Sequence, residues 1–574
     1  MNSVTSPERT NRALTIASAM VGLILVLLPN AVSATPSQAA PDSVPLFDNL
    51  GTHHYAITTS APQAQRYFDQ GLKLYYAFNH AEAVRAFEEA ARLDPDCAMC
   101  YWGLALAHGP NINAPMEREA ALAAYDAIQK AIAREVTASV KERALIRALA
   151  VRYVADPPKD RATLDAAYAQ ALRDVAQKDP TDFEVATLYA EALMDLSPWD
   201  YWTAEGQPRA ETPEILKQLD RVLAANPNHP GANHLYIHAV EAAQPERAVA
   251  AAERLAALMP GAGHIVHMPG HIYIRVGRYV DAITANEHAV HADEVYIEDH
   301  RPKNGIYTLG YYPHNYDFLA FAASMIGRSR QTMAAAEKMR AIAPMDLLRA
   351  PGMTFLQHHD TRHLQMLVRF ARWQEILEAP APAEDLAYAR AMWQYARGRA
   401  LAATGKIKEA EEALHQLRAT AENPDLAPLR LEFNTSGAIL RIAIEVLAGH
   451  VAETKGDVTA AITHLREGAR LEDALTYGEP PEWSVPVRQE LGMMLLRADR
   501  VTEAEQVFQQ DLKRFPDNGW SLRGLELALR RQGRKEEADR VQAKFNRVWS
   551  SADIDVPIQQ SGGRVDPGKD EVSS

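Results

Sequence analysis

Residues 71–95 read GLKLYYAFNHAEAVRAFEEAARLDP, and they place small or apolar residues at Gly71, Ala83, Phe87, Ala90 and Pro95. Counted from Gly71, the later positions lie 12, 16, 19 and 24 residues along the chain. The same offsets recur at Gly492, Ala504, Phe508, Asp511 and Pro516, at Tyr236, Ala248, Ala252, Leu255 and Pro260, and at Gly270, Ala282, Asn286 and Ala289. Ala248 and Ala282 are 34 residues apart, as are Ala504 and Ala538. A constant period of this length predicts a stack of repeated structural units.

This pattern resembles the tetratricopeptide repeat, a helix-turn-helix unit with small residues where its two helices pack closely. A glycine marks the turn in several copies, at Gly277, Gly327, Gly405, Gly456 and Gly533, where a helix C-cap favours a left-handed residue. The resemblance covers most of residues 61–549. It implies an all-α fold, an α-solenoid of tetratricopeptide-like hairpins wound into a right-handed superhelix. In such arrays the first helices line a concave groove, where most members bind peptides or partner proteins.

The composition is that of an ordinary globular protein, with 47% hydrophobic and 23% charged residues in 574. The formal net charge of -14 argues against nucleic acid or an anionic membrane as the main partner, because phosphate binding needs a basic surface. Few stretches alternate β-branched and polar residues, which also favours helices.

The N-terminus is typical of an export signal. Arg9 and Arg12 precede an apolar run over 13–28, and Ala-Val-Ser-Ala at 31–34 is a small-residue cleavage site. We therefore expect residues 1–34 to be removed and the mature protein to be periplasmic or secreted, with no membrane span. An uncleaved N-terminal anchor is the alternative.

The remaining chain divides by pattern and composition. We expect a linker over 35–60, then tetratricopeptide-like hairpins over 61–230, a central histidine-rich group over 231–345, further hairpins over 346–549, and a disordered tail over 550–574. Aromatic insertions at 197–213, 297–313, 351–359 and 477–483 interrupt the repeat. Because disordered loops are poor in aromatic residues, we expect these to be ordered loops folded over the groove.

Two histidine stripes stand on neighbouring first helices. His234, His238 and Glu241 follow one another at spacings of four and three, and His264, His267 and His271 at spacings of three and four. Such spacings fall on one face of a helix. The same repeat phase places His314 and Asp317 on the next first helix. Pro269 inside the second stripe predicts a kink or a late helix start.

Imidazoles with one or two carboxylates suit a divalent transition metal such as zinc, copper or iron. The sequence thus predicts a metal site formed by His234, His238, Glu241, His264, His267, His271 and His314. The alternative is a set of individually hydrogen-bonded histidines in a polar groove. If the site is catalytic, Glu241 is the candidate general base, although the His-Glu-x-x-His pattern of zinc hydrolases is absent.

Several other features carry weaker hypotheses. Cys97 and Cys100 are the only cysteines and predict a disulfide in an exported protein, with a redox or copper-binding role beside Met99 and His108 as the alternative. His53 and His54 are expected at the surface. His358, His359 and His363 can enter the groove from a later hairpin. Trp199, Tyr201 and Trp202 are expected either to stack on a ligand or to cap the apolar core, and Arg275 to be a solvated helix residue.

Three functions remain open at this point. The first is an exported binding protein whose groove takes a protein, a peptide or a small molecule, with a metal ion at the His/Glu cluster. The second is a metal-dependent enzyme, a hydrolase or an oxidoreductase, with its active site in the same groove. The third is a copper-handling protein. Glycine-rich phosphate loops and serine-nucleophile motifs are absent from the sequence.

Overall fold

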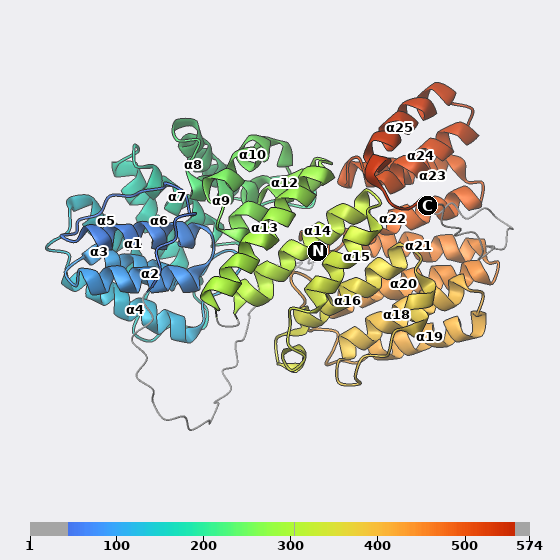
Figure 1. Ribbon diagram of the computed structural model, residues 1–574, viewed down its shortest axis with the longest axis horizontal. Coiled ribbons are helices and arrows are strands. Elements are labelled where there is room, and N and C mark those ends of the chain that lie inside the picture. The colour runs from blue at the N-terminus through green and yellow to red at the C-terminus, as the bar shows by residue number, and fades with distance from the viewer. Residues whose placement is uncertain (1–43, 303–304, 557–574) are drawn as a thin grey trace, which may run out of the picture.

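The computed structural model describes residues 44–302 and 305–556, and within these ranges the regular structure is helical, arranged as antiparallel hairpins that follow one another along the chain (Figure 1). The N-terminal helices are α1 (Pro62–Tyr76), α2 (His80–Leu93), α3 (Ala98–Ala107), α4 (Arg118–Ala133), α5 (Val140–Ala150), α6 (Ala162–Lys178), α7 (Phe183–Met194) and α8 (Thr212–Ala225).

The central helices are α9 (Pro230–Val240), η1 (Pro245–Ala248), α10 (Val249–Leu258), α11 (Gly263–His267), α12 (Pro269–Arg275), α13 (Tyr279–His300), η2 (Tyr307–Tyr311), α14 (Tyr312–Met325) and α15 (Ser329–Arg340). The C-terminal helices are η3 (Leu347–Arg349), α16 (Thr354–Arg369), α17 (Trp373–Glu378), α18 (Ala387–Ala403), α19 (Ile407–Ala421), α20 (Ser436–Thr454), α21 (Val458–Asp473), α22 (Val487–Arg497), α23 (Val501–Arg514), α24 (Gly519–Arg531), α25 (Lys535–Val548) and η4 (Trp549–Ser551).

The repeat positions found in the sequence are the places where successive helices touch. The Phe87 ring from α2 lies between α1 and α3, and a Cβ added at Gly71 or Gly103 would come within 3 Å of it. Phe508 occupies the same place between α22 and α24 at the far end of the chain. The fold is therefore the predicted all-α solenoid of tetratricopeptide-like hairpins, held together by a close-packed contact that recurs from unit to unit.

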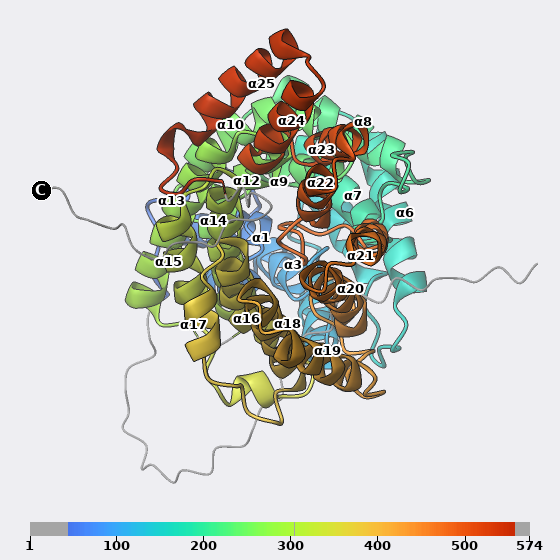
Figure 2. The same ribbon diagram turned by 90° about the vertical axis from the view of Figure 1, so that its right-hand side faces the viewer.

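Viewed along its length, the array winds so that the helices follow one another around a ring, with α20 and α22 facing α14 and α16 (Figure 2). One hydrophobic cluster runs from Leu50 to Met339 and a second from Met333 to Ala538. The boundary predicted between the N-terminal and central hairpins, after residue 230, falls inside the first of these clusters. The boundary predicted after residue 345 lies just beyond residues 333–339, where the two clusters overlap in the sequence. None of the helices in the described ranges is long and apolar enough to cross a membrane.

The two ends of the described chain are packed against the solenoid. In the segment 44–60, expected to be part of a linker, the Phe47 amide donates to Gln70 and the Thr58 hydroxyl to Glu142. At the other end, Asp553 accepts hydrogen bonds from the backbone and hydroxyl of Ser329. These contacts fasten both segments to helices. The expected signal segment 1–34 and most of the expected tail lie outside the described residues.

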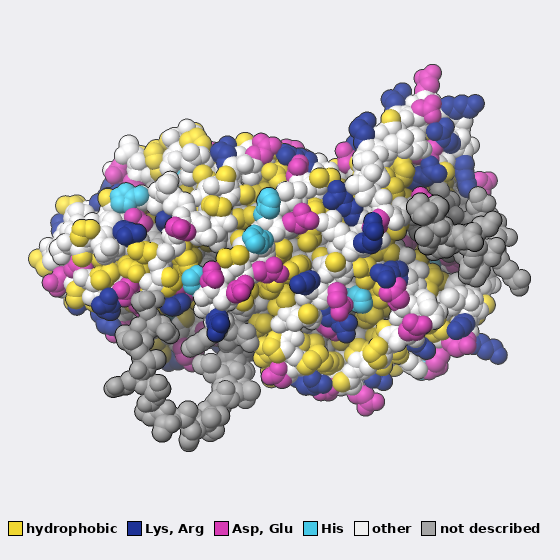
Figure 3. All heavy atoms as spheres, viewed as in Figure 1, with side chains coloured by type: hydrophobic (Ala, Val, Ile, Leu, Met, Phe, Trp, Pro, Cys, Tyr) yellow, Lys and Arg dark blue, Asp and Glu magenta, His cyan; other side chains and the backbone are white. Residues whose placement is uncertain are grey.

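Charged side chains of both signs are interspersed over the face of the molecule shown in Figure 3. Ion pairs between neighbouring helical turns, such as Arg92–Glu89 and Arg470–Glu467, are typical of this surface. Exposed pairs of this kind contribute little to stability, so the fold depends chiefly on the apolar contacts between hairpins.

Candidate metal centre

Four helical segments of the central part of the chain bring the predicted histidines together. α9 carries His234 and His238, α11 carries His264 and His267, α12 carries His271, and α14 carries His314. The helix is interrupted at Met268, between α11 and α12, because Pro269 has no backbone N–H to donate. The kink predicted from this proline is therefore confirmed. The break divides the second stripe between two short helices.

The six imidazoles form two groups of three. His234, His238 and His264 make the first triad, and His267, His271 and His314 make the second triad. Within each triad one ligand nitrogen per ring lies within 4.8 Å of the other two. Zinc–nitrogen bonds are about 2.0–2.1 Å long, so nitrogens this close can share one ion.

The triads are buried beneath loops and do not line an open groove. Five of the six triad histidines are at most 2% exposed, as is Glu241. The exception is His314, which is partly exposed. The aromatic insertions at 197–213 and 297–313, which were expected to fold over the groove, lie against these residues. Trp199 from the loop before α8 packs edge-on against His238, and Tyr311 of η2 lies 4.4 Å from His264 between ring centroids.

Each triad packs around its own phenylalanine ring. Phe78, at the end of α1, lies 4.4 to 6.1 Å from the three rings of the first triad between centroids. Phe318, on α14, lies 4.5 to 5.0 Å from the three rings of the second triad. Both phenylalanine side chains are fully buried. An apolar shell of this kind controls water access and local polarity around a ligand set.

Hydrogen bonds fix the tautomer of the first triad. His234 Nδ1 lies 2.6 Å from the backbone oxygen of Tyr76, which can only accept, so Nδ1 carries the proton. His238 Nδ1 donates in the same way to Glu241 Oε1 at 3.1 Å. Nε2 of both rings therefore has a free lone pair, and it is buried without a hydrogen-bond partner. Both nitrogens of His264 are likewise buried and unpartnered.

The second triad is oriented by the same kind of contact. His267 Nδ1 donates to Asn286 Oδ1 at 2.9 Å, and the Asn286 amide nitrogen in turn donates to the backbone of Ala282, which settles its orientation. His271 Nδ1 lies 2.6 Å from Glu241 Oε2. Metal-binding histidines are typically held in this way, with the second ring nitrogen donated to a carboxylate or carbonyl.

The Nε2 atoms of His267 and His271 face each other at 2.9 Å. With both Nδ1 atoms protonated, two lone pairs at this distance repel unless a cation or a proton lies between them. Burial alone would lower the pKa of His271, but the Glu241 carboxylate outweighs it and raises the pKa to about 9. Without a metal ion, His271 is thus an imidazolium that donates to His267.

The other triad members on α9 and α11 are held neutral. Burial, reinforced by neighbouring imidazoles, lowers the pKa of His234 and His264 well below the ordinary value, and the pKa of His267 falls likewise. Burial also lowers the pKa of His238. Neutral imidazole is the form that binds metal ions, so the site keeps these ligands ready across the physiological pH range.

Two carboxylates lie beside the triads. Burial would raise the pKa of Glu241, but His271 and His238 outweigh it and lower the pKa to about 2. Each Glu241 oxygen lies beside a histidine Nδ1: Oε1 beside His238 of the first triad and Oε2 beside His271 of the second. Glu479, from the loop between α21 and α22, lies 3.4 Å from His271 Nδ1 and 3.4 Å from Arg275 Nε. Arg275 also donates to the Glu241 backbone, so it is part of the site's frame and not a solvated residue.

A third group, His53, Glu184 and His229, is arranged differently. His229 Nδ1 accepts the backbone N–H of Ala232 and so caps helix α9, which leaves the proton on Nε2. That nitrogen lies 3.3 Å from Glu184 Oε2 and has no lone pair for a metal ion. The group is a hydrogen-bonded cluster at the side of an open pocket of about 570 Å³, which also includes Tyr55 and Asp182.

The remaining sequence candidates serve other purposes. His358 pairs with the Tyr388 hydroxyl, and His359 with Glu432. Asp317, on the face predicted for ligands, forms an ion pair with Arg362 at 2.6 Å. Neither later histidine nor this aspartate joins a triad.

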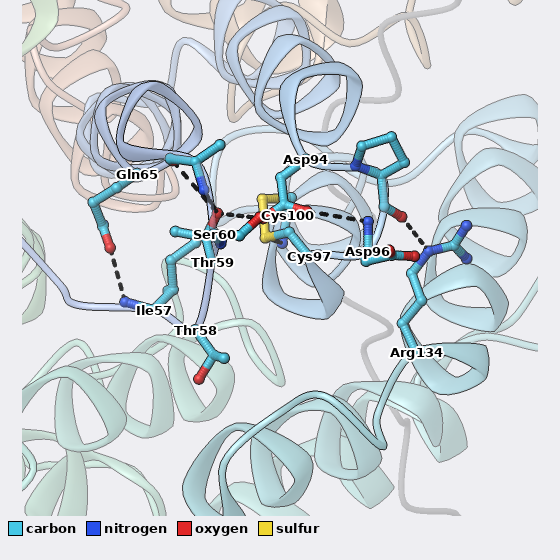
Figure 4. The surroundings of a disulfide bond; sticks show 12 residues. Ile57, Thr58, Thr59, Ser60, Gln65, Asp94, Asp96, Cys97, Cys100 and Arg134 are labelled. Atoms are coloured by element: carbon cyan, nitrogen blue, oxygen red, sulfur yellow. Dashed lines mark hydrogen bonds between the residues drawn. A yellow bond between two sulfur atoms is a disulfide. The ribbon is translucent and has the colours of Figure 1, made fainter.

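Cys97 and Cys100 are bonded to each other at the start of α3 (Figure 4). Both are buried, and beside them Asp94 accepts hydrogen bonds from Thr59 and Ser60 of the N-terminal segment. A disulfide leaves no thiolate for copper, so the structure gives the hypothesis of copper binding at this pair no ligand.

Sequence reasoning missed the two phenylalanines and Glu479. For Phe78 a signal existed. The residue stands at the turn position where five other copies have glycine, and it adopts the same left-handed backbone, with φ of 55°. A bulky residue at positive φ costs roughly 1–2 kcal/mol, and such strain tends to occur at functional sites. Trp199, which also contacts the first triad, has φ of 64°.

No protein-family model and no curated protein matches this sequence. Among solved structures, the chain is similar to human IFIT1 as a dimer with m7Gppp-AAAA, at 13% identity, with 86% of this chain and 91% of that chain covered and a TM-score of 0.31. It is also similar to yeast Tom70, at 12% identity, 84% and 92% coverage and a TM-score of 0.25. The tetratricopeptide domain of P58(IPK) gives 13% identity, 84% and 98% coverage and a TM-score of 0.21. At these values the comparisons carry no argument about function. The chain's own repeat packing makes it a tetratricopeptide-like α-solenoid.

Proposed function

We propose that this protein holds a transition metal in a buried centre formed by the two histidine triads, with the solenoid as the scaffold that positions them. The observation that carries the proposal is the matched orientation of four rings. His234, His238, His267 and His271 each direct Nδ1 to an acceptor and Nε2 toward other imidazoles. In the first triad the Nε2 atoms of His234 and His238 are buried without a partner, and in the second the Nε2 atoms of His267 and His271 lie 2.9 Å apart, so a proton or a metal ion must lie between those two rings.

The chemistry of the donor set fits zinc, copper or iron better than magnesium or calcium, which prefer oxygen ligands. When bound, such an ion supplies a Lewis acid or a redox centre. The chain's own residues orient the rings through Glu241, Asn286 and the Tyr76 carbonyl, and they exclude water through Phe78 and Phe318. Glu241 is poorly placed as the general base of an enzyme, because both of its oxygens face ligand N–H groups.

The test is metal analysis of protein purified without chelators and exposed to zinc, copper and iron salts. We expect bound metal in the wild type and a lower metal content in His267→Ala/His271→Ala, which removes two ligands of the second triad. The matched control is His229→Asn, which changes a buried histidine outside the triads while keeping a side chain able to cap α9. A metal-free wild type, or a double variant that keeps its full metal content, would refute the proposal.

We further propose that the protein acts outside the cytoplasm, from the pattern of residues 1–34, and that a protein, peptide or small-molecule partner binds the solenoid surface. Because the triads are covered, the partner would meet the scaffold and not the metal ligands. The pocket beside His53 and Asp182 is the candidate for a small ligand. Pull-down with the wild type and with Asp182→Ala distinguishes use of this pocket from binding elsewhere.

A further inference from the structure

We propose that the centre holds two copper(I) ions, one in each triad, and this inference rests on the proposed metal-binding function. A single ion bound by all six imidazoles would require their ligand nitrogens to form one group, with every nitrogen close to the other five. The 4.8 Å limit is met inside each triad, and the six nitrogens together do not form one group. The geometry therefore divides the ligands three and three.

The surroundings repeat the same division. Phe78 contacts the three rings of the first triad, and Phe318 contacts the three rings of the second. Each phenylalanine comes from a different part of the chain, the turn between α1 and α2 in one case and α14 in the other. A single ion at the centre of six rings would need one enclosing shell. Two shells, each fitted to three imidazoles, indicate two separate coordination sites.

Glu241 contacts a histidine of each triad, and these contacts are to Nδ1 atoms and not to a metal ion. Its Oε1 accepts from His238 of the first triad, and its Oε2 lies 2.6 Å from Nδ1 of His271 in the second. A carboxylate that orients one ligand in each triad fixes the position of both at once. Changing it should therefore affect two ions and not one.

The charge of the site favours monovalent ions. All six ligands are imidazoles, so the compensating charges nearby are the carboxylates of Glu241 and Glu479, and the buried guanidinium of Arg275 offsets part of these. The cost of burying an ion rises with the square of its charge, so a divalent ion costs about four times as much to desolvate as a monovalent one. Two monovalent ions leave a far smaller uncompensated charge than two divalent ions.

The number of ligands points to the same metal. Structural zinc sites have four protein ligands, and zinc sites with three histidines keep an open position for water, whereas each triad offers three imidazoles packed against an apolar ring. Imidazole suits copper, and the phenylalanine caps keep water away from the fourth position. Three neutral imidazoles under an aromatic ring therefore match copper(I) better than zinc.

The experiment is an anaerobic titration of the purified protein with copper(I) against a coloured copper(I) chelator, with zinc(II) titrated in parallel. We expect two copper(I) ions per chain in the wild type. His264→Gln, in the first triad, and His314→Gln, in the second, should each bind one, and the double variant none. Both ring nitrogens of His264 are buried without a hydrogen-bond partner, so its replacement leaves no donor or acceptor unpaired, and His314 is the one partly exposed member of the second triad.

His229→Asn is again the matched control and should bind two ions. A wild type that binds one ion, lost in both single variants, would overturn the two-ion inference and leave the proposed function intact. Two zinc(II) ions bound in preference to copper(I) would overturn the choice of metal. Binding of neither metal would refute the proposed function itself. Because the wild-type stoichiometry alone separates these outcomes, the result does not depend on how well the variants fold.

Discussion

At the scale of single residues, the site depends on which nitrogen of each histidine carries the proton. Glu241 decides this for two rings at once, because one of its oxygens faces His238 and the other faces His271. In this respect it resembles the carboxylate partners of metal-binding histidines in general, which orient a ring and raise its basicity.

Glu241→Gln tests this role. A glutamine amide has one accepting oxygen and one donating nitrogen, so only one of the two Nδ1–H groups keeps its acceptor. The other ring must change tautomer, which places a proton on the Nε2 that would bind metal. We expect the metal affinity measured by chelator competition to fall about 10- to 100-fold. Glu253→Gln, at an exposed carboxylate paired with Arg278, is the control and should bind as the wild type does. An unchanged affinity in Glu241→Gln would contradict the assignment.

A second residue-scale prediction concerns acid stability. Burial would raise the pKa of Glu490, but Arg399 and His450 outweigh it and lower the pKa to about 2. A carboxylate whose pKa is lower in the folded than in the unfolded state stabilises the fold above the unfolded pKa. That contribution is lost as pH falls through the folded value. Glu490→Gln should therefore cost about 3 kcal/mol at pH 6, because it leaves Arg399 buried without its partner.

The difference between the unfolding midpoints of the wild type and Glu490→Gln should narrow between pH 6 and pH 3. Glu411→Gln removes an exposed pair with Lys455 and should shift the midpoint little at either pH. If the difference in unfolding midpoint between the wild type and Glu490→Gln stays constant with pH, the pKa of the Glu490 carboxylate is not lowered in the folded state.

At the scale of the helical hairpin, the turn between α1 and α2 has a bulky aromatic residue at the left-handed position, where five counterparts have glycine and two have Ala371 or Asp499. Gly277, Gly327, Gly405, Gly456 and Gly533 take the left-handed conformation at the same position, where Phe78 stands in the first hairpin. Phe78 adopts this left-handed backbone conformation despite its steric strain, and its ring packs against the three imidazoles of the first triad. We interpret the strain as the consequence of placing an aromatic cap over a ligand set.

A pair of variants separates the backbone from the ring. Phe78→Ala loses the buried ring and keeps the strained φ, whereas Phe78→Gly loses the ring and relieves the strain. We expect the glycine variant to be the more stable of the two by about 1 kcal/mol in denaturant unfolding. Gly405→Ala calibrates the backbone cost, because an added Cβ there meets nothing within 4 Å. Equal stabilities of the two Phe78 variants would indicate that the position is unstrained.

The hairpins also show how far sequence reasoning reaches. Local spacing was enough to predict the solenoid, because Gly71 and Phe87 recur as Gly492 and Phe508 with the same offsets and the same contact. It was also enough to gather the six histidines, whose spacings of three and four place them on neighbouring helix faces. Their grouping into triads could be seen only in the structure. Helix α11 contributes one ring to each triad, and the interruption at Met268 directs His271 toward the second triad.

Contacts between distant parts of the chain could not be predicted. Glu479 reaches His271 from the loop between α21 and α22, and nothing in its own neighbourhood marks it as a partner. The cover over the triads likewise combines Trp199 with Phe433 from the C-terminal half of the chain, at 5.0 Å between ring centroids. Burial of the site therefore depends on the winding of the whole solenoid, which brings segments far apart in the sequence against the triads.

At the scale of the whole molecule, the centre joins helices α9 to α14 to a loop from the C-terminal half. An ion that binds only the folded form stabilises it by mass action, by about 4 kcal/mol when its free concentration is 1,000 times the dissociation constant. Addition of the metal should thus raise the thermal unfolding midpoint of the wild type. The double variant His267→Ala/His271→Ala, which keeps only the first triad, should show a smaller rise, whereas His229→Asn should respond as the wild type does. A rise of equal size in all three proteins would mean that the stabilisation comes from sites elsewhere.

The central claim is that the ligands of the metal are histidines of the two triads, and X-ray absorption spectroscopy of the metal-loaded protein tests it most directly. We predict an inner shell of about three nitrogens per ion near 2.0 Å, with the outer-shell scattering of imidazole rings. An inner shell of sulfur, or one of oxygens without imidazole scattering, would contradict the account.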